Sequence, residues 1–240
     1  PRRHPDGELR HRPVRLIPVE PVRQSFSDEL EQLRLQVEVM AVRVDQNLER
    51  MRTFLQTGDC VLAERTIAAD DEIDAMNLSL TERCHDLLAR EAPVASDLRF
   101  VVSVMRVLGE LERVGDLALR VVKVGENLEY VQRFPEVYDV LASMADTALD
   151  QFRQALAAWS SQDLGLAESL ARSGHVLDLA NDSLVRRLVA LDGLDAVPAA
   201  VHSLVIGKAL DRIADHSAII GSRLRYLLTG DPAHLAAEIR

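Results

Sequence analysis

An apolar residue occurs at every third or fourth position of this chain across residues 30–55. The positions are Leu30, Leu33, Val37, Met40, Val44, Leu48, Met51 and Leu55. Because an α-helix turns once in about 3.6 residues, these side chains form one stripe along a long helix. Ser25 or Ser27 is a suitable N-cap for this helix, and Gly58 is a suitable end. The stripe must be buried against other helices, so it predicts a helical bundle.

Cap and breaker residues divide the rest of the chain into five more helical segments. The expected ranges are 59–90, 96–128, 136–160, 163–191 and 198–229. Asp59 and Asp163 are the expected N-caps of the second and fifth helices. Aromatic residues make up only 4% of the chain, and glycine and proline are sparse after residue 21. That composition favours helices over a β-sandwich.

Short sequence matches recur in the same order in the two halves of the chain. Leu-Ala-Glu at 62–64 recurs at 166–168, and LERVGD at 111–116 corresponds to LDRIAD at 210–215. Shared order with one small length difference indicates an internal duplication. We therefore predict an all-α fold of two tandem antiparallel three-helix bundles related by pseudo-twofold symmetry.

The expected division of the chain follows from these segments. The first bundle covers residues 23–132, the second covers 133–230, and a C-terminal tail covers 231–240. Residues 1–21 hold five of the nine prolines and five arginines, without a helical period. We expect a disordered, basic, proline-rich arm over residues 1–22.

Charge and cysteine content limit the kinds of partner. The formal net charge is −10, which disfavours nucleic acid and anionic lipid and favours metal cations or a basic protein surface. Cys60 and Cys84 are the only cysteines and form no C-x-x-C pair, as in a reduced cytoplasmic protein. We find no transmembrane or signal-peptide segment, so a soluble protein that is not exported is expected.

Carboxylates recur one helical turn apart at corresponding places in both halves. The first half has Asp70, Asp74, Glu112 and Asp116, and the second has Asp178, Asp211 and Asp215. Residues at i and i+4 lie on one face of a helix. The second and third helices meet at the Pro93 turn, so we expect their acids to face each other across one groove. Helices five and six should do the same, with Gly174 in place of a fourth acid.

Facing carboxylates need protons, arginines or a metal ion for compensation. Oxygen ligands suit Mg²⁺, Mn²⁺, Ca²⁺ or iron, and Gly115 could let a helix or an ion approach closely. Two other interpretations stay open: a metal-free scaffold with solvated acids, and a carboxylate-bridged metal enzyme. The enzyme would need histidine ligands. Glu82 and His85 have the Glu-x-x-His spacing of di-iron bundles, but the other such pair, Glu8 and His11, lies in the arm.

Two further histidines adjoin the acidic positions. His175 could replace the missing carboxylate near Asp178, although a solvated side chain is the simpler interpretation. His216 directly follows Asp215, and we interpret it as a residue that hydrogen-bonds only locally.

These motifs together resemble the PhoU family. LERVGD and LDRIADHS are similar to its paired E(D)xxxD segments, and Pro93-Val-Ala-Ser-Asp-Leu-Arg99 is similar to its P-x-A-x-D-L-R turn. FSDEL at 26–30 and ADDEIDAMN at 69–77 also match family segments, so the resemblance covers residues 23–230. It implies two three-helix bundles.

The resemblance also implies metal sites. Family members bind iron, zinc or other divalent ions on the paired motifs, which places one site at Asp70, Asp74, Glu112 and Asp116. The second site falls at Asp178, Asp211 and Asp215. Gly174 departs from the acidic pattern, and Leu117 stands where histidine is common.

The role implied by the resemblance is regulatory and not enzymatic. Such a protein holds back the phosphate-starvation response by linking the ATPase subunit of a phosphate ABC transporter to a sensor histidine kinase. A cytoplasmic homodimer, brought to the inner face of the membrane by these partners, is the corresponding expectation.

Overall fold

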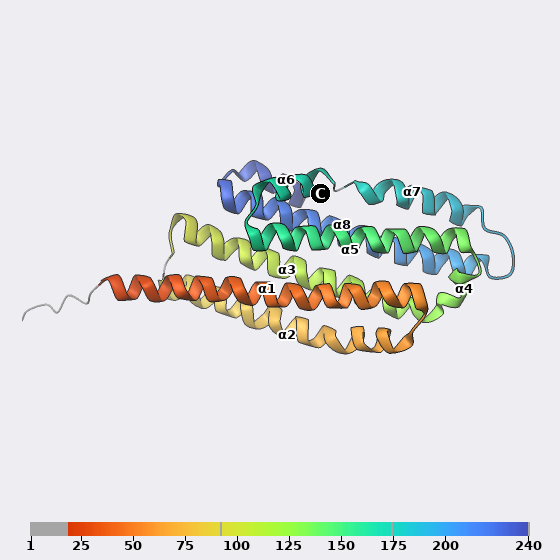
Figure 1. Cartoon of the computed structure of the whole chain (residues 1–240), viewed down its shortest axis with the longest axis horizontal. Helices are drawn as coiled ribbons and strands as arrows, with labels where there is room; N and C mark the ends of the chain where they lie inside the picture. Colours follow the sequence, from red (N-terminus) through yellow and green to blue (C-terminus); the bar gives the residue numbers. More distant parts are fainter. Residues whose placement is uncertain (1–18, 92, 174, 240) are drawn as a thin grey trace, which may run out of the picture.

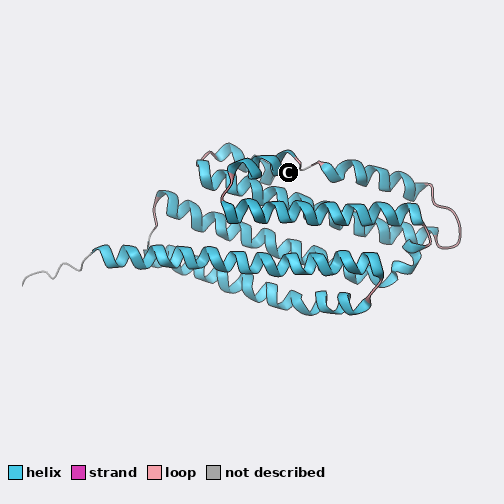
Figure 2. Cartoon of the chain, in the orientation of Figure 1, coloured by secondary structure: helices cyan, strands magenta, loops and turns pink. Residues whose placement is uncertain are grey.

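Helix α1 (Val19–Thr57) carries the predicted apolar stripe, and its members from Leu33 to Leu55 are buried. The computed structural model describes residues 19–91, 93–173 and 175–239. Over these residues the regular elements are helices, without a strand (Figure 2), which confirms the all-α prediction.

The start of α1 lies earlier than predicted, at Val19 instead of a cap at Ser25 or Ser27. Pro21 is compatible with this start because the N–H groups of a first helical turn have no acceptor within the helix. Residues 19–22 thus belong to α1 and not to the expected arm. The rest of that arm lies outside the described residues.

The next helices are α2 (Cys60–Glu91) and α3 (Ala95–Val124). Gly58 ends α1 with a φ of 70°, in the left-handed region that glycine adopts without strain. Asp59 Oδ1 accepts a hydrogen bond from the Val61 N–H at 2.9 Å, as expected of an N-cap. These two residues make the tight turn that returns α2 along α1.

The remaining chain forms two short and four longer helical segments and ends in a 3₁₀ stretch. They are η1 (Gly125–Asn127), α4 (Leu128–Gln132), α5 (Pro135–Ser161), α6 (Leu164–Arg172), α7 (Val176–Val189), α8 (Ala196–Thr229) and η2 (Pro232–Ile239). The third helix was expected to reach Leu128, but α3 ends at Val124 and η1 follows. Pro135 occupies the first turn of α5, where proline is favoured.

The single helix predicted for residues 163–191 is wrong, because α6 and α7 are separate. Asp163 caps α6 as predicted, accepting a 3.0 Å hydrogen bond from the Leu166 N–H. The helix then stops at Arg172, next to Gly174, which itself lies outside the described residues. Glycine is a poor helix former. The Ser173 carbonyl is satisfied from α5, where the Gln151 side-chain amide donates to it at 2.8 Å.

The long helices lie nearly along one axis, so the molecule is elongated (Figure 1). Helices α1, α2 and α3 pack together, and α5 and α8 pack with α6 and α7. The two groups meet where α3 lies along α8 and α1 lies along α5. Helix α2 and the α6–α7 pair therefore lie on opposite outer sides.

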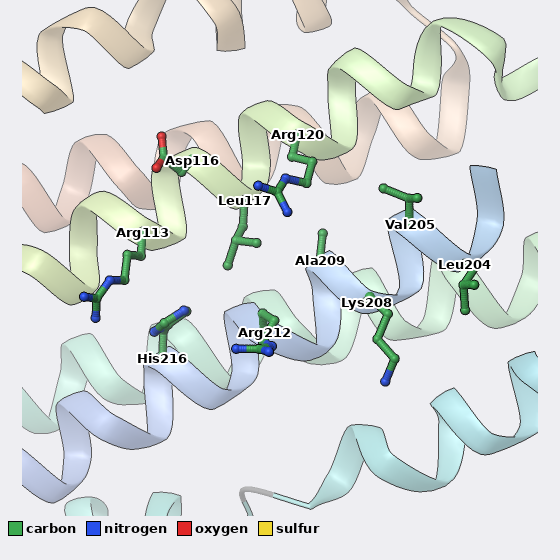
Figure 3. A pocket seen from close by; sticks show the side chains of 10 residues that line it. All are labelled: Arg113, Asp116, Leu117, Arg120, Leu204, Val205, Lys208, Ala209, Arg212 and His216. Carbon is green, nitrogen blue, oxygen red and sulfur yellow. The ribbon is translucent and has the colours of Figure 1, made fainter. Parts of the chain in front are cut away.

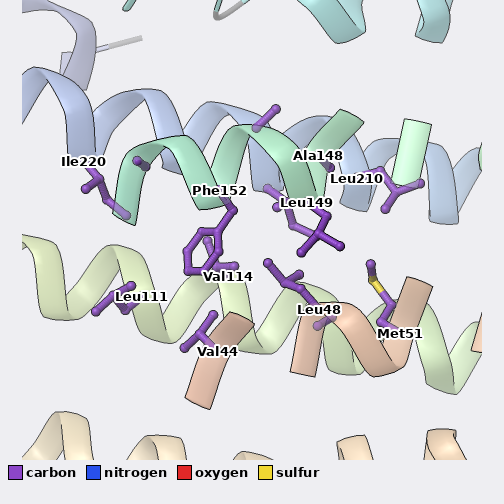
Figure 4. Close-up of a cluster of buried hydrophobic side chains, with 14 of the residues drawn as sticks. Val44, Leu48, Met51, Leu111, Val114, Ala148, Leu149, Phe152, Leu210 and Ile220 are labelled. Atoms are coloured by element: carbon purple, nitrogen blue, oxygen red, sulfur yellow. The ribbon is translucent and has the colours of Figure 1, made fainter. Parts of the chain in front are cut away.

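One apolar core runs through both bundles (Figure 4). Between the bundles, Val44 of α1 and Val114 of α3 lie near Phe152 of α5 in Figure 4, and Leu48 of α1 and Leu210 of α8 belong to the same cluster. All five side chains are fully buried. The core is continuous across this boundary, so removing one bundle would expose the apolar face of the other to water.

No helix among the described residues is both long enough and apolar enough to cross a membrane.

Candidate metal centre

Three carboxylates of the first bundle converge at the contact between α2 and α3. Asp74 of α2 and Glu112 and Asp116 of α3 each place one oxygen atom within 4.8 Å of the other two. All three belong to the four acids that the sequence predicts to face one another across a groove between these helices. Among the residues described, these three form the one such group of potential metal ligands. All three donors are oxygen atoms.

The packing of α2 on α3 explains why these acids meet. Gly115 is buried on α3, and a Cβ atom built on it would lie 3.5 Å from two carbon atoms of Ile73 on α2. The same Cβ would lie 3.7 Å from Asp70 Oδ1. These are ordinary contact distances. The helices approach closely, but glycine is not sterically required, as Ala214 at the matching position also suggests.

Asp70 lies beside the three converging acids and is not one of them. Its side chain is buried, and the burial, followed by the charges of Asp74 and Asp116, raises its pKa to about 6. Lys123 acts in the opposite direction on the same group. Of the four carboxylates predicted to face one another, three converge, and the fourth, Asp70, lies close enough to feel the charges of Asp74 and Asp116.

Electrostatic repulsion within this first cluster is not fully compensated by the protein. Burial raises the pKa of Glu112, and the neighbouring Asp116 and Asp74 raise it further, whereas Arg113 lowers it. Raised carboxyl pKa values report that negative charge is disfavoured there. A cation bound to the cluster would relieve that cost, so the donor set and its electrostatics both fit a hard metal ion.

The second acidic cluster is looser. Burial and then the charge of Asp211 raise the pKa of Asp215, and Asp178 contributes least in the same direction. Asp178 lies 2.9 Å from His175 Nδ1, and Asp211 lies 3.4 Å from Lys208 Nζ. These acids already have partners within the protein. They do not form a three-oxygen group as close as that of the first bundle, within the ranges described.

Glu110 is a buried polar residue of α3 that none of the sequence motifs indicates. Its side chain is 6% exposed. Glu110 Oε1 accepts a hydrogen bond from Arg113 at 2.8 Å, and Glu110 Oε2 lies 2.6 Å from His216 Nδ1. His216 belongs to α8, so our interpretation of a purely local hydrogen bond for it was wrong. The only available signal was a charged residue on the apolar face of α3, two positions before Glu112.

The remaining candidate ligands, two histidines and two cysteines, have ordinary environments. His85 is exposed on α2, and His175 is an exposed partner of Asp178. Both cysteines are free, and burial raises the pKa of the Cys84 thiol to about 11. That value is the opposite of what a reactive thiolate needs.

Comparison with known proteins gives a consistent picture. The model of the PhoU domain matches two segments, residues 37–124 and 141–224. Together these segments cover most of the chain and fall on the two bundles. The chain belongs to the PhoU family.

The PhoU relatives resemble this chain over most of its length. The phosphate-specific transport system accessory protein PhoU of Escherichia coli is 27% identical over 89% of each chain. The PhoU homolog of Pseudomonas putida is 29% identical over 90% of this chain and 86% of its own. Among solved structures, PhoU from Pseudomonas aeruginosa superposes with a TM-score of 0.80 at 28% identity, covering 86% of this chain and all of that one.

The phosphate transport system regulatory protein PhoU from Streptococcus pneumoniae has a TM-score of 0.77, also at 28% identity, over 86% of this chain and 98% of its own. The PhoU fold predicted from the sequence is thereby confirmed. The family consists of regulatory accessory proteins of phosphate transport.

Proposed function

We propose that this PhoU-family chain regulates phosphate uptake and the phosphate-starvation response as an adaptor. It would bind the ATPase subunit of a phosphate ABC transporter and a sensor histidine kinase, and so pass the state of the transporter to the kinase. The observation that carries this proposal is the match of the PhoU domain to both bundles. An elongated body with a net charge of −10 offers long side surfaces for protein contacts.

The proposal includes a metal ion at the first acidic cluster. The ion would be held by Asp74, Glu112 and Asp116, with the buried Asp70 beside them. Oxygen-only donors suit iron, Mn²⁺ or Mg²⁺ better than zinc, which prefers nitrogen and sulfur ligands. The ion would supply charge compensation and would stiffen the contact between α2 and α3.

The second cluster would bind more weakly. It has three acids, Asp178, Asp211 and Asp215, one fewer than the first cluster with Asp70. His175 contacts Asp178, and Lys208 contacts Asp211. A metal ion there would have to displace those partners. The first bundle is therefore the principal site of the proposal.

Purified components test the adaptor role directly. Biolayer interferometry would measure binding of the full chain to the ATPase subunit and, separately, to the cytoplasmic part of the kinase. Each measurement would be made with Mn²⁺ and with a chelator. We expect binding to both partners. The adaptor role would be refuted if the chain bound neither partner, with Mn²⁺ or with the chelator.

A matched pair of variants connects the metal to this binding. Glu112→Gln with Asp116→Asn should abolish any difference between the Mn²⁺ and chelator conditions. Asp71→Asn with Glu72→Gln changes the charge equally at exposed positions of α2 and should preserve that difference.

A further inference from the structure

A groove between α3 and α8 has a chemical character opposite to that of the whole chain (Figure 3). Its volume is about 670 Å³, which is in the range of small-molecule sites. It lies where the two bundles meet, so neither bundle forms it alone. In Figure 3, Arg120 and Leu117 point from α3 toward α8.

Positive charge dominates the groove. Arg113, Arg120, Lys208 and Arg212 line it together with a single carboxylate, Asp116. The chain as a whole has a net charge of −10. Four cations gathered on one face of such a body create a local potential that favours an anion.

The protein itself compensates only some of these cations. Arg113 is paired with Glu110 at 2.8 Å, and Lys208 has a longer contact of 3.4 Å with Asp211. Arg120 and Arg212 are exposed and form no ion pair or side-chain hydrogen bond with other described residues, although the charge of Arg212 lowers the pKa of the nearby Asp215. Their guanidinium groups, one from each bundle, are therefore available to a ligand.

One wall of the groove is apolar. Leu204 and Val205 of α8 are 42% and 36% exposed, and Leu117 of α3 is half-buried. The buried Ala209 lies between the arginines and this wall. A ligand that filled the groove would therefore meet guanidinium groups at one part and aliphatic side chains at another.

We propose that this groove binds a small organic phosphate carrying two or more phosphate groups, of the nucleoside di- or triphosphate class. Guanidinium groups bind phosphate oxygens through paired N–H donors, and the aliphatic wall would cover the organic part of the ligand. A long polyanion such as nucleic acid is disfavoured, because the acidic clusters on α3 and α8 flank the groove. This site does not depend on the proposed adaptor role or on bound metal.

Isothermal titration calorimetry with ATP, pyrophosphate and adenosine tests the site. The full-length chain would be measured in a chelator, so that a metal ion at the acidic cluster cannot hold the phosphates. We expect ATP to bind more tightly than pyrophosphate, and adenosine not to bind measurably. Equal affinities for ATP and pyrophosphate would overturn the assignment of an organic ligand.

Paired variants separate the groove from the general charge of the protein. Arg120→Gln with Arg212→Gln should weaken ATP binding roughly tenfold for each arginine removed. Arg65→Gln with Arg186→Gln makes the same charge change at exposed positions of α2 and α7 and should leave the affinity unchanged. Equal weakening by both double variants would overturn the proposal.

A third variant tests the apolar wall. Leu204→Ser, at an exposed position, should weaken ATP binding and leave pyrophosphate binding unchanged. Circular dichroism would check that each variant is folded. ATP that fails to bind at millimolar concentration, or an acidic peptide that binds where ATP does not, would overturn the proposal.

Discussion

His216 of α8 and Glu110 of α3 join the two bundles through a contact of 2.6 Å between Nδ1 and Oε2. The two side chains are 15% and 6% exposed, so the contact is largely shielded from water. The second oxygen of Glu110 accepts from Arg113 at 2.8 Å. Both carboxylate oxygens thus have partners, as a buried acid requires. This arrangement connects α3 to α8 beside the groove between them.

Loss of the Glu110 carboxylate should destabilise the chain. We expect Glu110→Ala to lower the free energy of unfolding by about 1–3 kcal/mol, because His216 is left without its partner. Adding His216→Ala should cost less than the sum of the two single variants, as for residues in direct contact. Urea unfolding measures all three, with the exposed Glu64→Ala as control. Strict additivity would show that the contact contributes nothing.

Metal binding should depend on the first cluster more than on the second. Glu112→Gln with Asp116→Asn removes two of the three converging oxygen donors and should lower the bound Mn²⁺ or iron severalfold. Asp211→Asn with Asp215→Asn should have a smaller effect, because those acids do not converge with Asp178 as closely. Elemental analysis after dialysis gives the metal content. Unchanged metal content in the first double variant would remove the site from α2 and α3.

The stability of the metal-free protein should depend on the ionisation of Asp70. Its pKa is about 6 in the folded chain, above its ordinary value of 3.8. The folded state therefore binds more protons than the unfolded state. The ionised Asp70 lowers the free energy of unfolding at pH 7, and this loss of stability disappears as the pH falls from about 6 toward 3.8. Asp70→Asn should stabilise the metal-free protein at pH 7 by on the order of 1–2 kcal/mol after allowing for solvent screening.

Chemical unfolding of wild type and Asp70→Asn across this pH range checks that prediction. The advantage of the variant should shrink as the pH is lowered and vanish near pH 4. An advantage that does not change with pH would mean that packing, and not ionisation, causes it.

Two glycines in long helices should respond oppositely to alanine. A Cβ atom on Gly221 of α8 would lie 2.8 Å from Leu170 Cδ2 and 3.4 Å from the Ala167 carbonyl oxygen of α6. We expect Gly221→Ala to destabilise by about 1–3 kcal/mol through overpacking. Gly109 of α3 has nothing within 4 Å of the same atom, so Gly109→Ala should stabilise by about 0.5–1 kcal/mol. Thermal unfolding of both variants would reveal whether α6 presses on α8 this closely.

Features that depend on neighbouring residues were predictable from the sequence. Asp59 and Asp163 cap their helices as predicted, because a cap requires only a side chain and an N–H group two or three residues further along the chain. The apolar stripe of α1 is buried as its spacing indicates. The break after Arg172 was not predicted because Leu170 and Leu177, on either side of it, lie seven positions apart as in one continuous helix, although Gly174 lies between them. The spacing of apolar residues does not show whether contacts with other helices are sufficient to keep a helix continuous through a glycine.

Local sequence is enough to predict a helical chain with acids one turn apart on particular helix faces, since both follow from the geometry of a helix. The duplication follows from the repeated motifs. The packing of the helices decided that Asp74, Glu112 and Asp116 converge while Asp70 is buried beside them. It also decided that His216 reaches Glu110 and that Arg120 faces α8 across the groove. Such contacts depend on the rotation and level of helices far apart in the chain, which are set by the packing of the shared core.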